Sequence, residues 1–368
     1  MQSPESDLRS VVDLYDPRSP LETAYTIPAD WYVDPRIADL ERKTTFSRTW
    51  QLVARADQLT KPGSYVTTTV AGEPIVVVRG DDGKIRGFFN VCRHHAAEVM
   101  TDAEGTTPHL RCPYHGWTYG LDGALKGTPD FAGVCEFDRG KNGLVPVRTE
   151  EWETFVFVRL DPDGPSLRED LGDLVEQFRP LGLDELHFFE RRIYKFQCNW
   201  KVFVDNYLDG GYHIPFLHKG LDSVLNYSSY TIENGARYCL QASPMESTDA
   251  EAATGAVRKG EKALYYWIHP NFMVNWYEGI MDTNLVIPLG LDRTEVVFDF
   301  YFAGSDAERN KASVAIGERI QGEDTAICES VQRGLGSRAY RAGRLSVRRE
   351  AGEHLFHRLL HADLEAGL

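Results

Sequence analysis

The sequence lacks any run of about 18 or more apolar residues, which argues against a membrane-spanning helix. Its first residues, MQSPESDLRS, lack the basic segment followed by an apolar segment that marks a secretory signal. Six cysteines in 368 residues are too sparse for a disulfide scaffold. We therefore expect a reducing, cytoplasmic location, with a plastid location after loss of a transit peptide as the alternative.

Positive charge is also scarce. Lys and Arg number 40 against 55 Asp and Glu, so the formal net charge is −15. An acidic surface argues against nucleic acid or an anionic membrane as a partner. It is compatible with a cationic small substrate.

The pattern of strands and helices predicts an α+β protein. Residues 51–160 contain short β-branched segments and an Asp82-Gly83 hairpin signal, which predicts a small all-β domain that ends at a turn-rich boundary. It precedes a larger α+β domain, residues 161–368, in which an antiparallel sheet packs with helices. Residues 1–50 form a helical segment expected to pack with the larger domain. Helices are predicted over 35–50, 199–212 and 307–335, and strands over 64–70, 74–79, 85–91, 152–160, 272–276, 284–287 and 294–302.

Two matched Cys/His pairs lie in the all-β region. The sequence reads Cys92-Arg-His94, then 17 residues, then Cys112-Pro-Tyr-His115. A structural zinc accepts such a set, and so does a Rieske [2Fe–2S] cluster, in which one iron has two Cys ligands and the other two His ligands. Common zinc fingers keep their two Cys together, whereas here each half supplies one Cys and one His, which favours the Rieske cluster.

The residues after the second pair support that interpretation. Trp117 and Tyr119 follow in the stretch CPYHGWTY. We expect them to pack on the cluster and to donate a hydrogen bond to a sulfur atom, which tunes its potential. The motif resembles the Rieske signature.

A second set of ligands is predicted in the larger domain. His213 and His218 follow Gly210-Gly211 and flank Pro215, so the helix that precedes them is expected to end and let both rings converge. Asp324 falls on an otherwise apolar stripe, with Ile320, Ile327 and Val331, on the helix predicted over 307–335, where a carboxylate needs a cation. Two His and one carboxylate on one face of an iron leave positions for O₂ and substrate. The alternative is that Asp324 pairs with an arginine such as Arg333 or faces water.

Over nearly its whole length the chain resembles the α subunits of Rieske non-haem iron oxygenases. The resemblance implies a [2Fe–2S] Rieske cluster and a mononuclear Fe(II), and a reaction in which one atom of O₂ enters a C–H bond and the other leaves as water. It also implies an acidic residue that bridges the cluster of one subunit to the iron of the next. Many members place this acid three positions before the first iron-binding His, where this chain has Gly210. Asp209 lies four positions before His213, so we assign the role to Asp209, with Asp205 as the second candidate.

Within that family, four stretches resemble the branch that hydroxylates choline on the way to glycine betaine. These are NWKVFVDNYLDGGYHIPFLHKGL, IHPNFMVNWY, MDTNLVIPLG and EDTAICESVQRGL. Betaine demethylases and carnitine oxygenases share parts of them. The resemblance therefore implies hydroxylation of a quaternary ammonium substrate, with choline giving betaine aldehyde hydrate; the alternatives are N-demethylation of a betaine and attack on an aromatic or natural product.

The substrate pocket is predicted from aromatic residues. Residues 265–277 are rich in Tyr, Trp and Phe, and aromatic faces attract a quaternary ammonium group. Such residues in strands are more commonly core. The expected cage residues are Phe203, Tyr207, Trp267 and Trp276.

The resemblance also implies partners. No G-x-G-x-x-G follows a strand and no plant-type ferredoxin spacing occurs, so electrons are expected from a separate NAD(P)H-dependent reductase or ferredoxin. Transfer between subunits implies a ring, a homotrimer. A pure electron carrier and a zinc-stabilised binding protein remain as competing classes.

Some chemistry-bearing residues find no role in this scheme. His354, His357 and His361 recur at helical spacing near the C-terminus, where a solvated helix face is expected rather than a metal site. The remaining cysteines, Cys135, Cys198, Cys239 and Cys328, are predicted to be small buried residues.

Overall fold

The computed structural model describes residues 7–217, 227–245 and 260–368. It divides into two compact units, each treated separately below. The β unit is Arg42–Asp170, and the α+β unit combines Met1–Glu41 with Leu171–Leu368. The predicted fold class, a small all-β domain with a larger α+β domain, is confirmed.

The β unit contains two antiparallel sheets. The larger has seven strands in the order β1-β10-β9-β4-β3-β2-β5, and the smaller has three in the order β6-β7-β8. Two separate apolar clusters fill this unit, and one of them includes Cys92 and Cys112. The strands are β1 Gln51–Arg55, β2 Ser64–Val70, β3 Glu73–Arg79, β4 Ile85–Phe89, β5 Glu104–Thr106, β6 Leu110–Arg111, β7 Thr118–Tyr119, β8 Leu125–Gly127, β9 Pro146–Trp152 and β10 Phe155–Arg159.

One predicted strand is two strands. The segment expected to run over 152–160 contains the end of β9, a tight turn and all of β10, which pair as a hairpin. Glu153 lies in the turn with φ of +53°, a left-handed conformation that breaks an extended strand. The alternation of apolar residues was read correctly for β10, but it did not show where the turn lies.

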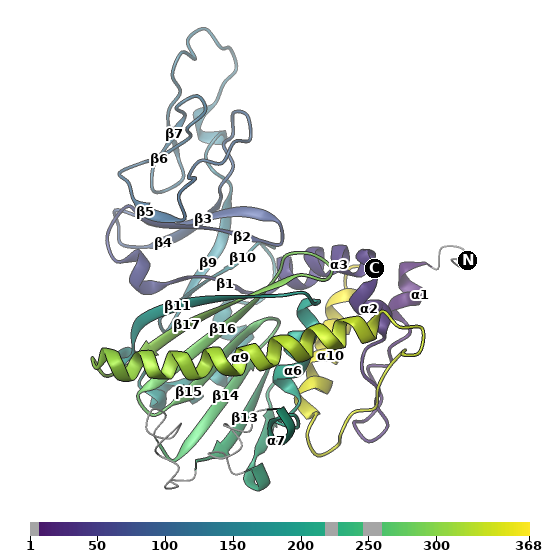
Figure 1. Cartoon of the computed structure of the whole chain (residues 1–368). Helices are drawn as coiled ribbons and strands as arrows, with labels where there is room; N and C mark the ends of the chain where they lie inside the picture. Colours follow the sequence, from purple (N-terminus) through teal and green to yellow (C-terminus); the bar gives the residue numbers. More distant parts are fainter. Residues whose placement is uncertain (1–6, 218–226, 246–259) are drawn as a thin grey trace. The chain divides into compact units, whose positions relative to one another are not determined.

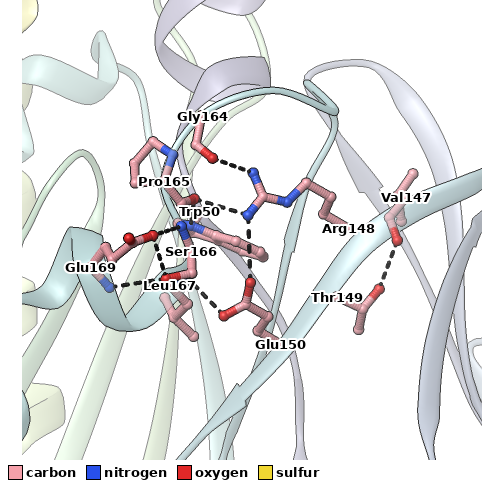
Figure 2. A network of polar contacts seen from close by, with 10 residues as sticks. All are labelled: Trp50, Val147, Arg148, Thr149, Glu150, Gly164, Pro165, Ser166, Leu167 and Glu169. Carbon is pink, nitrogen blue, oxygen red and sulfur yellow. Dashed lines mark hydrogen bonds and ion pairs between the residues drawn. The ribbon is translucent and has the colours of Figure 1, made fainter.

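The chain enters and leaves the β unit at neighbouring points. The N–H of Asp161 donates to the carbonyl of Ser47 at 2.9 Å, and the indole of Trp50 donates to the carbonyl of Pro165 at 3.3 Å. Arg148 of β9 donates to the carbonyls of Gly164 and Pro165 (Figure 2). These bonds fix the turn-rich segment that the sequence marks as a boundary.

A seven-stranded antiparallel sheet forms the centre of the α+β unit. Its order is β11-β17-β16-β15-β14-β13-β12, so neighbours in the sheet are mostly neighbours in the chain. The strands are β11 His187–Phe196, β12 Thr231–Asn234, β13 Tyr238–Pro244, β14 Lys262–Ile268, β15 Phe272–Tyr277, β16 Ile280–Pro288 and β17 Thr294–Phe302.

Helices pack on this sheet. The long helix α9 runs across it (Figure 1), and Gly317 lets α9 approach the ring of Phe300 closely. Helix α6 contacts both α9 and α10, helices α1 and α3 contact α10, and α2 contacts α9. The helix expected over 35–50 is α3 followed by a π-helical turn over Arg42–Phe46. The α-helices of this unit include α1 Leu8–Val12, α2 Ala29–Val33, α3 Pro35–Glu41, α5 Leu174–Phe178, α6 Trp200–Leu208, α7 Ile214–Leu217, α9 Ala307–Leu335 and α10 Ala351–Glu365, and α4 Leu167–Leu171 spans the boundary.

Candidate functional site

Helix α6 and the turn after it carry the first residues of the site. The side chain of Asn199 caps α6 by accepting from the N–H of Lys201. The helix ends at Leu208 because Gly210 and Gly211 have φ of +66° and +69°. A Cβ on Gly210 would lie 2.1 Å from the carbonyl oxygen of Arg349, so this position requires glycine.

The turn places His213 against Asp209. Oδ2 of Asp209 lies 2.6 Å from Nδ1 of His213 and accepts from its backbone N–H at 3.0 Å. These two contacts fix the orientation of the ring. A carboxylate on one ring nitrogen is the usual partner of a histidine that binds a metal through the other nitrogen.

The other nitrogen of His213 faces the predicted carboxylate. Its Nε2 lies 4.0 Å from Oδ1 of Asp324, which is beyond hydrogen-bond distance. A metal ion that both atoms bind at about 2.0–2.2 Å fits within this distance. Asp324 is buried on α9 and accepts from Asn206 at 3.0 Å and from Gln321 at 3.2 Å. This donor set fits a mononuclear iron; the third predicted ligand, His218, lies outside the described residues.

Asp205 lies elsewhere. It is one turn before Asp209 on α6, and its carboxylate contacts the hydroxyl of Tyr32 and Nε2 of His357. Of the two predicted bridging acids, Asp209 therefore contacts His213 in the described part of the chain. The solvated face predicted for the α10 histidines is wrong, because His354, His357 and His361 are all buried.

A cavity of about 800 Å³, including its open mouth, contains both His213 and Asp324 in its lining. One row of residues across five neighbouring strands forms much of its floor. Strand register pairs each member with the next, and alternate residues of a strand share a face. The row is Gln241 on β13, Tyr265 on β14, Asn275 on β15, Asp282 on β16 and Phe300 on β17.

Aromatic residues are prominent in the lining of this cavity. Four tyrosines line it, and Tyr265 and Tyr277 bring their hydroxyls within 3.0 Å of each other. Burial raises the pKa of Tyr207 and of Tyr230 well above the ordinary value, so both remain neutral phenols. The tyrosines are Tyr207, Tyr230, Tyr265 and Tyr277.

Asp282 is the second carboxylate of the cavity. It is buried on β16 and accepts from the side-chain amide of Asn275 at 2.6 Å. Asn275 in turn accepts from the hydroxyl of Tyr207, so α6 and Asp282 belong to one network. The sequence argument missed Asp282, although an acidic residue within the apolar strand Ile280–Pro288 was a usable signal.

Two of the four predicted cage residues line the cavity. Phe203 and Tyr207 do, whereas Trp267 and Trp276 are not among its lining residues. Trp267 is on the face of Tyr265 but further along β14, where it packs on Phe356 of α10. Trp276 is next to Asn275 and therefore faces the other side of the sheet, and its indole donates to the carbonyl of Leu181.

The four predicted ligands of the β unit come together in two matched turns. The N–H of Ala96 donates to the carbonyl of Cys92, and the N–H of Gly116 donates to that of Cys112. The rings of His94 and His115 have centroids 4.8 Å apart. Nδ1 of His94 is buried without a hydrogen-bond partner in the described chain. A buried nitrogen of this kind beside two buried thiols fits a [2Fe–2S] cluster with two Cys and two His ligands.

Aromatic residues surround these turns. The hydroxyl of Tyr119 lies 3.3 Å from Sγ of Cys92, as predicted for a tuning contact. Trp117 stacks on the ring of His94 with centroids 4.7 Å apart and planes 7° from parallel. Phe131 packs against both rings. Of the remaining cysteines, Cys198, Cys239 and Cys328 are buried as predicted, whereas Cys135 is exposed.

Comparisons with known proteins match both units. Residues 49–138 match the Rieske [2Fe-2S] domain family, and residues 183–366 match the catalytic domain of the ring hydroxylating alpha subunit family. In the part of the chain that is described, no helix has the length and apolarity needed to cross a membrane.

Individual relatives cover nearly the whole chain. The chloroplastic choline monooxygenase of Arabidopsis thaliana is 39% identical over 98% of this chain and 88% of that protein. The carnitine monooxygenase oxygenase subunit of Escherichia coli (strain K12) is 33% identical over 87% of each. A solved quaternary ammonium Rieske monooxygenase, 28% identical, superposes with a TM-score of 0.85 over 94% of this chain and 96% of that one.

Proposed function

The chain belongs to the Rieske non-haem iron oxygenases, and we propose that it hydroxylates a C–H bond of choline to give betaine aldehyde hydrate. The relatives named above act on quaternary ammonium compounds by their names, and the choice of choline among these rests on the cavity of this chain. Carnitine and glycine betaine carry a carboxylate that choline lacks.

The observation that carries the proposal is the charge of the cavity. The described residues that line it include no Lys or Arg, and Asp282 is a carboxylate outside the proposed iron ligands. A trimethylammonium group has no hydrogen-bond donor, so tyrosine faces and a nearby carboxylate suit it. The carboxylate of carnitine or glycine betaine would need a cationic partner, since burying an unpaired charge is costly.

The residues of the α+β unit have separate tasks in this scheme. His213, Asp324 and His218 would hold the mononuclear iron, which when bound supplies the site where O₂ is activated. Asp209 orients His213, and Asn206 and Gln321 hold the carboxylate of Asp324 in place. The aromatic lining excludes water and places the substrate's C–H bond at the open face of the site.

The β unit supplies electrons. Cys92, His94, Cys112 and His115 would hold the [2Fe–2S] cluster, which accepts electrons one at a time. A separate NAD(P)H-dependent reductase or ferredoxin delivers them. Of the two oxygen atoms, one enters the product and the other becomes water, which requires two electrons from the reductase.

We also propose a homotrimer in which electrons cross between subunits. Support comes from exposed aromatic residues beside both metal sites. Tyr114, next to His115, is 65% exposed, and Phe216, three residues after His213, is 79% exposed. Tyr and Phe are enriched at protein–protein interfaces, so these residues suit contact with a second copy.

The cytoplasmic location expected from the sequence stays a proposal. All six cysteines are free thiols, a state that a reducing compartment maintains. The plant relatives are named as chloroplastic, so the same chemistry also operates in plastids.

The proposal is tested by O₂ uptake. Iron-replete full-length protein with a ferredoxin reductase is given choline, glycine betaine, carnitine or an aromatic acid in turn. We expect uptake stimulated by choline, with betaine aldehyde formed in proportion. A His213→Ala preparation measures the background uptake of the reductase itself.

Other outcomes discriminate between the alternatives. Uptake with glycine betaine and release of formaldehyde would replace hydroxylation of choline by N-demethylation. Stimulation by carnitine alone would place the chain with the carnitine enzymes. Either result keeps the family and discards choline.

A further inference from the structure

A second cluster of potential metal ligands lies between α6 and α10. Asp205, Glu353 and His357 each offer one ligand atom, and these three atoms lie within 4.8 Å of one another. We propose that these three residues bind a divalent transition-metal cation, distinct from the mononuclear iron. This site does not depend on which substrate the enzyme oxidises.

The distances suit a shared ion. Oδ1 of Asp205 lies 3.0 Å from Nε2 of His357, and Oε1 of Glu353 lies 3.8 Å from the same nitrogen. Atoms bound to one metal at about 2.0–2.2 Å lie three to four ångströms apart. Glu353 and His357 are four residues apart on α10, so they share one face of that helix.

Glu353 is the observation that points to a ligand. Glu353 is 7% exposed, and within the described part of the chain its carboxylate accepts no hydrogen bond. Its Oε1 lies 3.8 Å from Nε2 of His357, and that nitrogen already contacts Asp205 at 3.0 Å. To keep its charge in this position, a buried carboxylate needs a cation.

Neighbouring groups shape the site further. The hydroxyl of Tyr32 lies 2.6 Å from Oδ2 of Asp205, which directs Oδ1 to the cluster. Burial, and then the carboxylates of Asp205, Glu350 and Asp209, raise the pKa of Glu353 well above its ordinary value. The ammonium group of Lys201 attracts the carboxylate of Asp205 electrostatically. However, its direct partner is Glu41, at 2.6 Å, so it does not neutralise the cluster. A divalent cation would offset this excess of negative charge.

The ligand types indicate which cations to use. One imidazole and two carboxylates suit Mn²⁺, Fe²⁺ or Zn²⁺ better than Ca²⁺ or Cu⁺. Because Asp205 precedes Asn206, which donates to Asp324, a cation here would join α10 to the helix that supports the iron carboxylate. We expect its effect on stability rather than on the oxidation itself.

The test counts bound manganese in a protein whose iron site is disabled. Full-length His213→Ala protein, carrying its cluster, is dialysed against Mn²⁺, desalted and measured by mass spectrometry of the metals; Zn²⁺ is run in parallel. We expect about one Mn²⁺ or Zn²⁺ per chain. The same measurement is made after adding His357→Ala, Glu353→Gln or His361→Ala, the last as a matched control on the same helix.

The variants give opposite expectations. Binding should be lost with His357→Ala and Glu353→Gln and kept with His361→Ala. Mn²⁺ should raise the melting temperature of the parent but not of the Glu353→Gln protein. If His357→Ala loses the visible spectrum of the cluster, that variant has not folded correctly. Metal binding by the isosteric Glu353→Gln variant then tests the proposal.

Two results would overturn the proposal. Metal bound equally by the parent and by Glu353→Gln would place it elsewhere. No binding of Mn²⁺ or Zn²⁺ by the parent would mean that a protonated Glu353 and the hydrogen bond between His357 and Asp205 hold this cluster without a cation. Neither result bears on oxidation of choline, because the count uses no substrate.

Discussion

Nδ1 of His213 lies 2.6 Å from Oδ2 of Asp209, across the turn that ends α6. The same carboxylate oxygen accepts the backbone N–H of His213, so two bonds fix the ring relative to its own main chain. The opposite nitrogen is thereby directed to Asp324. The relationship makes Asp209 the group whose loss should disturb the iron site without removing a ligand.

We expect Asp209→Asn to lower kcat with choline by about 10- to 100-fold, the range for partners of metal-bound histidines. The amide keeps the shape and one acceptor but removes the charge. Steady-state kinetics and iron content measure the effect, with the visible spectrum of the cluster as a control. Asp205→Asn is the comparison, since Asp205 does not contact His213. A larger loss from Asp205→Asn would exchange their roles.

His213→Ala should abolish turnover and leave the visible spectrum of the Rieske cluster intact. The four proposed cluster ligands lie in the β unit, and His213 lies in the α+β unit. Absorption spectra and O₂ uptake of the same preparation check both halves of the expectation. A lost spectrum would show that the two sites are not independent.

Electron transfer between subunits predicts complementation. Chains with Cys112→Ser lack the cluster, and chains with His213→Ala lack the iron; each alone should be inactive. Coexpressed with different tags and purified as a mixed oligomer, they should regain activity, because an intact cluster can then serve an intact iron in the neighbouring subunit. Mixed oligomers that carry both metals and remain inactive would place the route within one chain.

Asp282→Asn should raise the KM for choline by about 10- to 100-fold, or roughly 1.4–2.7 kcal/mol, because it removes a charge facing the ammonium group. The control ligand is 3,3-dimethylbutan-1-ol, which has the shape of choline without its charge. Inhibition by this alcohol should be the same in the variant. Equal weakening of both ligands would indicate a change of shape rather than of charge.

The buried pair Lys201 and Glu41 should dominate the stability of α6. Both side chains are almost fully buried, and Nζ lies 2.6 Å from Oε1. Lys201→Met leaves an unpaired buried carboxylate, which costs about 3–5 kcal/mol. Chemical denaturation measures this cost. Adding Glu41→Gln, which keeps an acceptor for Trp200, should recover part of it; a further loss would contradict the pairing.

Motifs predicted the sites better than periodicity did. The Cys/His spacing identified four residues of the β unit that the fold brings together, and it was expected that the helix would end near Gly210. Asp324 is buried as predicted, yet Ile327 and Val331 of the proposed stripe are 38% and 44% exposed. The buried side of α9 instead includes Gly317, Gln321 and Cys328. Small and polar residues pack there, and an apolar count does not detect them.

Tertiary contacts explain what the sequence did not show. Trp276 is one residue from Asn275, and strand parity alone decides which of them faces the cavity. That parity is set by pairing with β14 and β16, which the isolated segment does not encode. The histidines of α10 were expected on a solvated helix face, but α1, α6 and β12 contact this helix.

The Asp161 N–H donates to the Ser47 carbonyl and the Trp50 indole to the Pro165 carbonyl, and these bonds bring the two ends of the β unit together. The β unit is thus an insertion within the chain of the other unit. During synthesis, the β unit emerges whole and can fold on the ribosome. The pair of Glu41 and Lys201 can form only after the whole β unit has been synthesised. An insertion with adjoining ends is also an exchangeable module. Transplanting residues 42–170 from a relative would change the electron-accepting part while leaving the substrate cavity as it is.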